Sequence, residues 1–266
     1  TAGQALVLET LFAEALSATA TGHRNILKIL DTNARDEEGY IVTEAFDGMP
    51  LDEWVEINGA ISPDNIVGFL YKSCSALAAA ERKNVIHYDL QPRHILIAKD
   101  YNVRVANLGL AQPRRLDGPI LEPGMAPLVR AIFTAPEVCE GGPMNACSSV
   151  YALGVTSYYA ATGRYPVAGE SPLSTALKQI AGQIVPPEER SKKIPEALSH
   201  IILKMLRRNP ERRYKNFRQV IDDVELLQAK RNLAHARRSE FRQTEIKTEE
   251  LQPVFCIIKG RNRGAA

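Results

Sequence analysis

His87-Tyr88-Asp89-Leu90-Gln91-Pro92-Arg93-His94 is the stretch from which the architecture of this 266-residue chain can be read, and Asn107-Leu108-Gly109 begins thirteen residues after His94. Short apolar segments at 85–86 and 95–97 flank the first stretch, and 103–105 leads into the second. Short runs rich in β-branched residues favour strands. We therefore expect a short strand at each of these three segments.

The residues before this region predict a small, strand-rich start. Apolar residues at helical spacing, with Gly22 as a stop, predict a helix over 5–20. The segment 23–30 leads into a strand, 36–39 has the composition of a hairpin turn, and 40–44 is expected to be a buried strand.

The residues after this region predict helices. A helix also precedes it, over 62–82, because Ser62-Pro63 combines a good N-cap with proline in the first turn. Residues 110–135 are proline-rich and are expected to be irregular. The segment 150–162 is apolar nearly all round, as in a helix at the centre of a domain. Further amphipathic helices are expected over 171–183, 195–207 and 216–229. This order of strands and then helices is typical of an α+β fold.

Further motifs occur in a fixed order along the chain. They are Ala135-Pro136-Glu137, Ser149-Val150-Tyr151-Ala152-Leu153-Gly154, Thr162-Gly163-Arg164-Tyr165-Pro166 and Asn209-Pro210-Glu211-Arg212-Arg213-Tyr214. With the two opening stretches, this layout resembles the bacterial type of eukaryotic-like Ser/Thr protein kinase over about residues 5–228. The resemblance implies a two-lobed α+β fold, with an N-terminal lobe truncated to a few strands and one helix and a mainly helical C-terminal lobe.

The resemblance divides the chain into three parts. Residues 1–50 would form a partial N-terminal lobe and hinge, 51–228 the helical lobe, and 229–266 a basic extension or linker. This last part carries nine Lys and Arg residues against four Glu, a net charge of +5. Within it, Val254–Ile258 is a short apolar segment that pairs with a sheet edge, docks on a partner or begins a further domain. The sequence leaves these three readings open.

The resemblance assigns roles to five positions of the expected active site. Asp89 stands at the catalytic base, Gln91 replaces a lysine, and His94 and Asn107 replace the two metal-binding residues. Glu14 stands where the family has a glutamate that pairs with a strand lysine, and this chain contains neither that lysine nor the glycine-rich loop. Glu14 as a solvated helix carboxylate and Asp89 as a loop-organising carboxylate are the alternative readings.

Other positions are assigned to nucleotide contact or to the fold. The resemblance makes the segment around Thr43, Glu44 and Phe46 a vestigial hinge that would meet adenine. Glu137 and Arg213 would form a buried ion pair. Ser149 replaces an aspartate that grips the backbone of the His87 loop; we expect its hydroxyl to accept a weaker hydrogen bond there.

The replaced residues favour a pseudokinase, a kinase-like domain without catalysis. Mg²⁺ prefers oxygen ligands, carboxylates above all, so an amide and an imidazole are a poor exchange. We therefore expect no enzyme activity, no catalytic residue, no metal and no cofactor, and a regulatory or scaffolding role through a protein partner or a neighbouring domain of a larger polypeptide. The alternative is a weak or atypical ATP- and Mg²⁺-dependent Ser/Thr kinase whose missing elements precede Thr1. In a third reading, the C-terminal tail occupies the degenerate cleft.

Bulk composition narrows the function classes. The net charge is +2, and the sequence has no apolar run long enough to span a bilayer and no signal peptide. A membrane is therefore not an expected partner. A nucleic acid is not expected either, because the basic tail lacks aromatic residues placed among the basic ones for stacking on bases. The four scattered cysteines have no metal-binding spacing and predict reduced thiols in a cytoplasmic protein.

Overall fold

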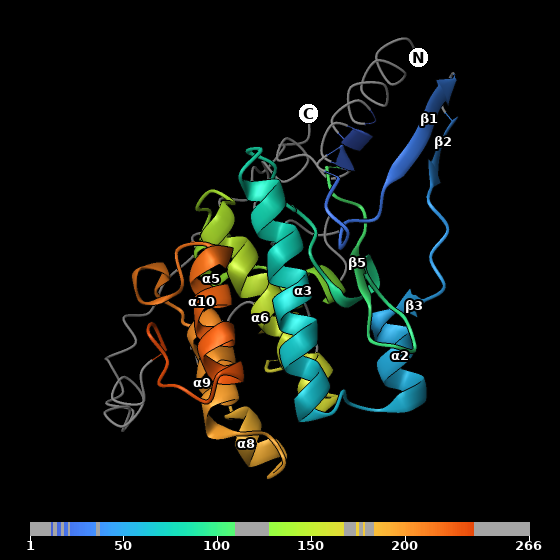
Figure 1. Ribbon diagram of the computed structural model, residues 1–266. Helices are drawn as coiled ribbons and strands as arrows, with labels where there is room; N and C mark the ends of the chain where they lie inside the picture. The colour runs from blue at the N-terminus through green and yellow to red at the C-terminus, as the bar shows by residue number, and fades with distance from the viewer. Residues whose placement is uncertain are drawn as a thin grey trace, which may run out of the picture.

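The computed structural model describes residues 12, 15, 16, 19, 20, 22–35, 38–109, 128–167, 174, 175, 178 and 184–236. Their strands precede most of their helices along the chain, as expected (Figure 1). The elements are β1 (Ile29–Arg35), β2 (Glu38–Thr43), β3 (Met49–Pro50), α2 (Leu51–Asn58), α3 (Pro63–Glu81), η1 (Pro92–His94), β4 (Ile95–Ile97), β5 (Val103–Val105), α4 (Leu128–Phe133), α5 (Pro136–Cys139), α6 (Ala146–Thr162), α8 (Pro187–Arg190), α9 (Glu196–Met205), η3 (Pro210–Arg212) and α10 (Phe217–Gln228).

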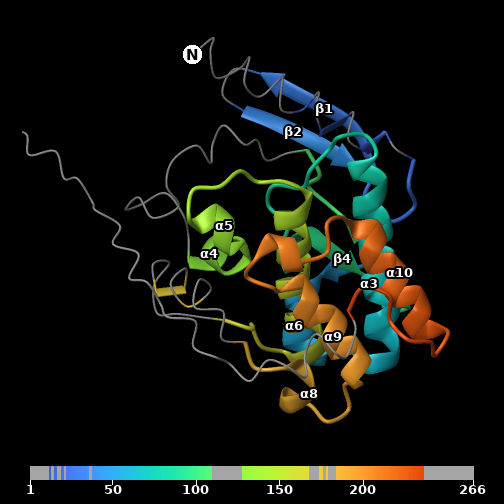
Figure 2. The same ribbon diagram turned by 90° about the vertical axis from the view of Figure 1, so that its left-hand side faces the viewer.

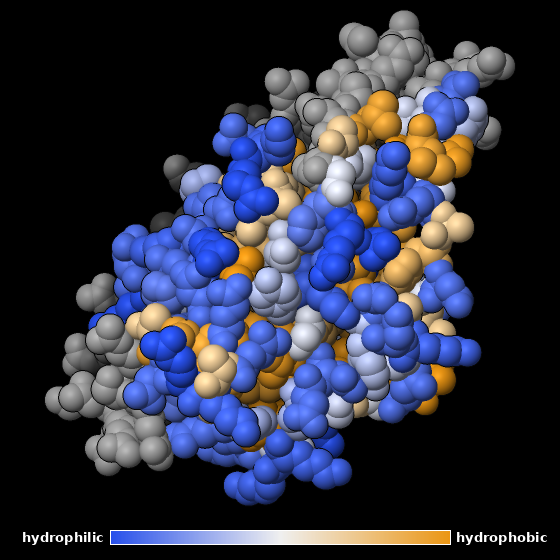
Figure 3. Space-filling model, viewed as in Figure 1, coloured by the Kyte–Doolittle hydropathy of each residue, from blue (hydrophilic) through white to orange (hydrophobic). Residues whose placement is uncertain are grey.

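The first two strands form an antiparallel hairpin. Its register runs from Ile29↔Thr43 to Arg35↔Glu38, with an irregularity between Ile29 and Asp31. Tyr40 is 54% exposed and Val42 is 42% exposed, so the expectation of a buried strand at 40–44 is wrong. In a hairpin of two strands, alternate residues face away from the rest of the protein. Figure 3 shows apolar surface among the polar residues of this region.

A second sheet joins β3, β4 and β5 in that order, with antiparallel pairing. Its strands at 95–97 and 103–105 confirm two of the three predicted segments. The third, Val85–Ile86, is not a strand. The chain turns at Asn84, which has a φ of 58°, and the amide of Val85 bonds to the carbonyl of Ala80 at the end of α3.

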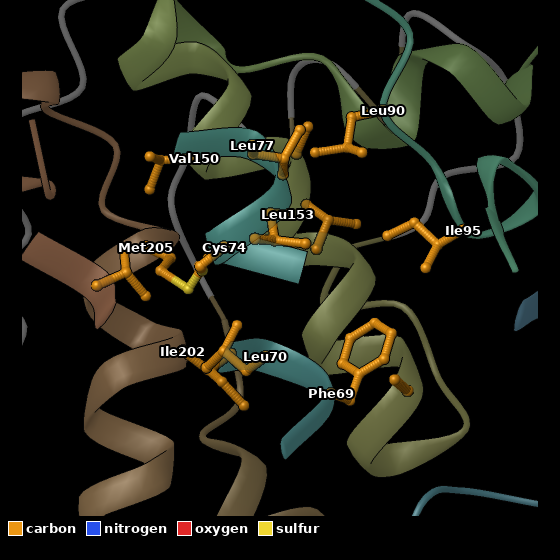
Figure 4. Close-up of a cluster of buried hydrophobic side chains, with 14 of the residues drawn as sticks. Phe69, Leu70, Cys74, Leu77, Leu90, Ile95, Val150, Leu153, Ile202 and Met205 are labelled. Carbon is orange, nitrogen blue, oxygen red and sulfur yellow. The ribbon is translucent and has the colours of Figure 1, made fainter. Parts of the chain in front are cut away.

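Among the described residues, the longer helices α3, α6, α9 and α10 contribute much of the core. The predicted helices over 62–82, 150–162, 195–207 and 216–229 are thus confirmed, with ends shifted by a few residues. Figure 4 shows Leu70, Cys74 and Leu77 of α3 against Leu153 of α6 and Met205 of α9. All five are at most 2% exposed, so the central position predicted for α6 is confirmed.

The capping of these helices differs in part from expectation. Ser62 is the N-cap of α3, but its side chain makes no cap hydrogen bond. Of the two predicted features of this helix start, only the proline in the first turn therefore acts as expected. Asn145 and Ser148 form a reciprocal capping box at α6. Gly163 ends α6 with a φ of 69°, a conformation that glycine adopts without steric cost.

Among the described residues, four helices lie where none was predicted: α2, α4 and the short helices α5 and α8. Leu51, Trp54 and Val55 are buried on one face of α2, at a helical spacing that was overlooked. Within the stretch expected to be irregular, α4 forms at 128–133, with Ala131 and Phe133 buried. Residues 110–127 of that stretch lie outside the described residues. So do most of the predicted helices 5–20 and 171–183, of which residues 12, 15, 16, 19, 174, 175 and 178 are helical.

The hairpin lies across one end of the molecule and α8 near the other, with the β3–β5 sheet and α2 on the same side as the hairpin (Figures 1 and 2). The fold is therefore α+β, with a small strand-rich part and a mainly helical part. Among the described helices, none combines the length and the apolar character needed to cross a bilayer.

Candidate active site

His87 anchors the loop between α3 and β4. It is 3% exposed, and its Nε2 lies 2.9 Å from the carbonyl oxygen of Ala106. Because a carbonyl only accepts, Nε2 carries the proton and the bare Nδ1 accepts the amide of Asp89 at 3.3 Å. Burial is the main cause that lowers the pKa of His87 to about 4, so the ring is neutral at pH 7. The loop is thereby tied to the end of β5.

A second histidine holds Asp89 from the other side. The Nδ1 of His94 donates to the Asp89 carbonyl at 2.6 Å and lies 3.7 Å from the Asp89 carboxylate. The two imidazole rings are stacked, with centroids 6.1 Å apart. Asp89 therefore has its backbone fixed at both the amide and the carbonyl, which orients its half-buried carboxylate.

Gln91 lies in the same loop, immediately before η1. It is 6% exposed, so this amide is buried in the loop rather than extended into solvent. A neutral amide has no long-range attraction for phosphate, whereas a lysine ammonium has. The loop thus offers hydrogen bonding at this position without positive charge.

Asn107 lies two residues after the end of β5 and is exposed. Its φ of 57° is left-handed, a conformation that asparagine and aspartate tolerate better than most residues. The preceding residue, Ala106, donates its amide to the His94 carbonyl at 2.8 Å and accepts from His87. Asn107 thus follows a residue that is bonded to both His87 and His94 of this loop.

The oxygen donors of this cluster fit a metal ion only in part. No group of three or more His, Cys, Asp or Glu side chains suited to a metal ion occurs among the described residues. With its proton on Nδ1, His94 offers only the nitrogen Nε2, whereas Mg²⁺ prefers oxygen; the oxygen ligands here are the Asp89 carboxylate and the Asn107 amide. Mg²⁺ is often held by one or two protein carboxylates together with substrate phosphates and water. The residues fit an ion of that kind, not a closed protein site.

The expected hinge lies between β2 and β3. Thr43 is exposed at the end of β2, and the amide of Glu44 bonds to the Lys28 carbonyl at 2.9 Å. The Glu44 carboxylate accepts from Arg104 at 3.2 Å, and the guanidinium of Arg104 lies 5.0 Å from the centre of the Phe46 ring. Arg104 was not singled out in the sequence. A charged residue between two apolar ones in β5 was the signal that could have found it.

Comparison of the sequence with known proteins places this chain in a family. Residues 3–224 match the model of the protein kinase domain. The chain belongs to the protein kinase family. A probable serine/threonine-protein kinase of Clostridium acetobutylicum is 32% identical over 211 residues, which is 79% of this chain and 32% of that protein. PrkC of Bacillus subtilis is 31% identical over 246 residues, 92% of this chain and 37% of PrkC. PknB of Mycolicibacterium smegmatis is 31% identical over 215 residues, 79% of this chain and 34% of PknB.

The kinase domain spans about a third of the length of these relatives. The crystal structure of Rad53 1–466 in complex with AMP-PNP resembles it with a TM-score of 0.66 and 21% identity, over 81% of this chain and 54% of the Rad53 chain. This second likeness shows the fold alone. The predicted kinase-like fold and the bacterial Ser/Thr kinase relationship are confirmed.

Two sequence-based expectations about this kinase domain are wrong. The family match over 3–224 and relatives named as Ser/Thr kinases overturn the expectation that the chain is not an enzyme. The same findings overturn the expectation of no cofactor, since protein kinases take the phosphoryl group from ATP with Mg²⁺. Both expectations rested on three replaced side chains, whereas the family match extends over the whole domain.

The buried ion pair expected of the kinase domain is present. Arg213 and Glu137 meet through two nearly parallel bonds of 2.6 and 2.9 Å, and the Arg213 side chain is 0% exposed. Arg213 also donates to the carbonyls of Cys147, Arg207 and Arg208. Its donors are thus shared between the segment after α9 and the starts of α5 and α6.

Ser149 contacts the His87 loop, but its hydroxyl donates the hydrogen bond that it was expected to accept. Its hydroxyl donates to the His87 carbonyl at 3.4 Å and to the Asn145 carbonyl at 3.2 Å. An aspartate can only accept at this position, whereas a serine in a helix readily returns its proton to a carbonyl one turn back. The hydrogen bond from Ser149 to the His87 loop is therefore long, and its single proton is shared between two carbonyls. Glu14 and the tail beyond residue 236, including Val254–Ile258, lie outside the described residues.

Proposed function

We propose that this chain is an ATP-dependent Ser/Thr protein kinase domain with an atypical, slow active site, working within a longer polypeptide. The observation that carries the proposal is the double histidine support of Asp89, beside Asn107. To act as a general base, a carboxylate must be held in position near the substrate hydroxyl, whichever residues hold it there. The retained Asp89 has that support.

The side chains take unequal parts in the proposed reaction. Asp89 would accept the proton of the substrate hydroxyl, and the buried Gln91 would add no positive charge near the transferred phosphate. The Asn107 amide oxygen would hold a Mg²⁺ ion, which supplies positive charge next to the phosphates. Loss of one preorganised electrostatic contact typically costs about 10²–10³ in rate, so turnover should lie well below the usual roughly 1–100 per second.

The division into 1–50, 51–228 and 229–266 is part of this proposal, as is a cytoplasmic location. A lysine-bearing strand and a glycine-rich loop, expected of the family and not found in this sequence, would come from elsewhere in the polypeptide. The full-length protein is therefore the right material for an assay.

Transfer of radiolabelled phosphate from ATP tests the proposal. We expect slow, Mg²⁺-dependent labelling of a protein substrate that Asp89→Asn abolishes. Glu53→Gln, at an exposed carboxylate of α2, is the matched control and should leave labelling unchanged. Equal labelling by the wild type and Asp89→Asn would overturn the proposal.

A gain-of-function variant tests the role of Asn107 separately. Asn107→Asp returns a carboxylate that Mg²⁺ prefers, at a φ that aspartate also tolerates. We expect it to raise the rate by about ten-fold or more, and Asn107→Ala to lower it. Mg²⁺ titrations of all three proteins give the measurement, and an unchanged Mg²⁺ dependence in Asn107→Asp would contradict the assignment.

Regulation through contact with a protein partner or a neighbouring domain is a second candidate role. The replacements Gln91, His94 and Asn107 favour it, because they reduce charge in the cleft without disturbing the Glu137–Arg213 pair. Thermal unfolding with ATP and Mg²⁺ separates the two roles. Saturation at 100 times Kd would add about 2.7 kcal/mol of stability to a nucleotide-binding domain. No shift and no labelling would overturn the proposed kinase activity and favour the regulatory role.

A further inference from the structure

Two segments connect the β1–β2 hairpin to the rest of the fold, and both lie against β5. The first precedes β1 and is held by backbone bonds: Leu27 donates to the Val105 carbonyl at 2.9 Å, and Val105 donates to Asn25 at 2.8 Å. The side-chain amide of Asn25 adds a bond to the Val103 carbonyl at 2.9 Å. This crossing is thus fixed to the residues on either side of Arg104.

The second crossing, from Glu44 to Phe46, is held to β5 by the side chain of Arg104. Its Nε lies 3.2 Å from the Glu44 carboxylate, and that same carboxylate oxygen accepts the Lys28 amide at 3.2 Å. Its guanidinium also lies 5.0 Å from the centre of the Phe46 ring. One side chain therefore contacts both ends of this short segment.

Gly48 allows the Phe46 ring to take this position. A Cβ at Gly48 would stand 2.4 Å from the ring and 2.8 Å from the Ile97 carbonyl oxygen, both shorter than real Cβ contacts. The ring thus packs over a position without a side chain, next to the end of β4. Its place under Arg104 depends on that close approach.

The strand that carries Arg104 continues straight into the active site. Ala106, two residues later, bonds to both His87 and His94, and Asn107 follows. We propose that Arg104 is a positioning residue that holds the hinge, through Glu44 and Phe46, at a fixed distance from Asn107. The link to nucleotide rests on the proposed function; the mechanical link between hinge and β5 does not.

Hydrogen exchange of the nucleotide-free protein tests the mechanical part. The amide of Glu44, bonded to Lys28, and the amide of Gly48, bonded to Phe46, report on the hinge. A partly exposed ion pair and a cation–π contact together predict exchange roughly three- to ten-fold faster in Arg104→Gln. Arg104→Lys, which keeps the charge, should give a smaller change.

Arg218→Gln is the matched control, because Arg218 pairs with Asp222 at 2.9 Å on α10. It should leave both hinge amides at the wild-type rate. The proposal is overturned if Arg104→Gln exchanges like the wild type at Glu44 and Gly48. It is equally overturned if the acceleration is the same over α3 and α6, which would mean a general loss of stability.

Kinetics with ATP test the link to nucleotide. We expect Arg104→Gln to raise the KM for ATP about three- to ten-fold and to change kcat less, with Arg104→Lys in between. An unchanged KM in an active Arg104→Gln enzyme would overturn this link. If the wild type neither binds ATP nor transfers phosphate, the proposed function fails, and the exchange experiment still decides whether Arg104 positions the hinge.

Discussion

Arg213 illustrates how much of this fold depends on single buried side chains. It is a fully buried cation whose compensation comes from Glu137 and three backbone carbonyls. Charges in such places are stable only when nearly every donor is used. The resemblance to kinases predicted the partner, and the structure adds the carbonyls.

Arg213→Met should therefore lower the free energy of unfolding strongly. It leaves Glu137 and the carbonyls without their donor, and breaking one side of a buried pair costs about 3–5 kcal/mol. Arg208→Met is the control, because its pair with Glu140 is 47% and 42% exposed. Such a pair contributes about 0.2–1 kcal/mol. Urea denaturation measures both variants, and equal losses would contradict the assigned role of burial.

His87 predicts how stability depends on pH. Burial first, and the nearby His94 second, lower its pKa from the ordinary value of 6.5 to about 4. The unfolded chain therefore binds this proton before the folded chain does, so the stabilisation is complete above pH 6.5 and is lost as the pH falls towards 4. The full effect is about 3 kcal/mol.

His87→Gln should flatten the stability profile between pH 6.5 and 4, because glutamine keeps a donor for the Ala106 carbonyl but does not titrate. His23 is the comparison: burial and nearby arginines lower its pKa as well, but it is less buried. The denaturation midpoint of the wild type should fall as the pH is lowered across this range. This dependence on pH should be weakened less by His23→Gln than by His87→Gln. The reverse order would contradict the assignment of this pH dependence to His87.

At the scale of elements, the helices that the sequence predicted best are those with apolar residues on a fixed period. The ends of α3, α6, α9 and α10 lie within a few residues of expectation because the period comes from neighbours in sequence. By contrast, Val85–Ile86 has a strand-like composition but pairs with no strand among the described residues, since the chain there closes the end of α3. Composition predicts a strand only where packing supplies a neighbour.

The packing of α6 on α9 gives a prediction at this scale. A Cβ at Gly154 would lie 2.8 Å from the Met205 Cβ and 3.2 Å from Leu206. Gly154→Ala should destabilise the protein by about 1–3 kcal/mol, because overpacking outweighs the better helix propensity of alanine. In α3, Gly68 has nothing within 4 Å of an added Cβ. Gly68→Ala should therefore stabilise by about 0.5–1 kcal/mol. Thermal unfolding of both variants decides, and a stabilising Gly154→Ala would contradict the close contact.

At the scale of the whole molecule, protection against unfolding should be uneven. The hairpin exposes Leu30, Tyr40 and Val42, whereas α6 is buried along most of its length. A two-stranded hairpin is only marginally stable by itself, and regions with little buried apolar surface open before the core does.

Hydrogen exchange followed by mass spectrometry should therefore find the hairpin peptides, over 29–35 and 38–43, exchanging about 100-fold faster than α6 or more. Peptides of α10, which packs in the same core, serve as the internal reference. Protection of the hairpin equal to that of α6 would mean that the two parts unfold as one unit.

Motifs and periodicity are local properties of the chain, so the sequence alone was enough for the family and the α+β order of elements, and it named Asp89 and Asn107 as candidate site residues. It did not reveal the hinge contact of Arg104 with Glu44, the tie between His87 and Ala106, or the direction of the Ser149 bond. These pairs are 60, 19 and 62 residues apart. Only the packing of whole elements decides which distant side chains meet, because no spacing within one element carries that information.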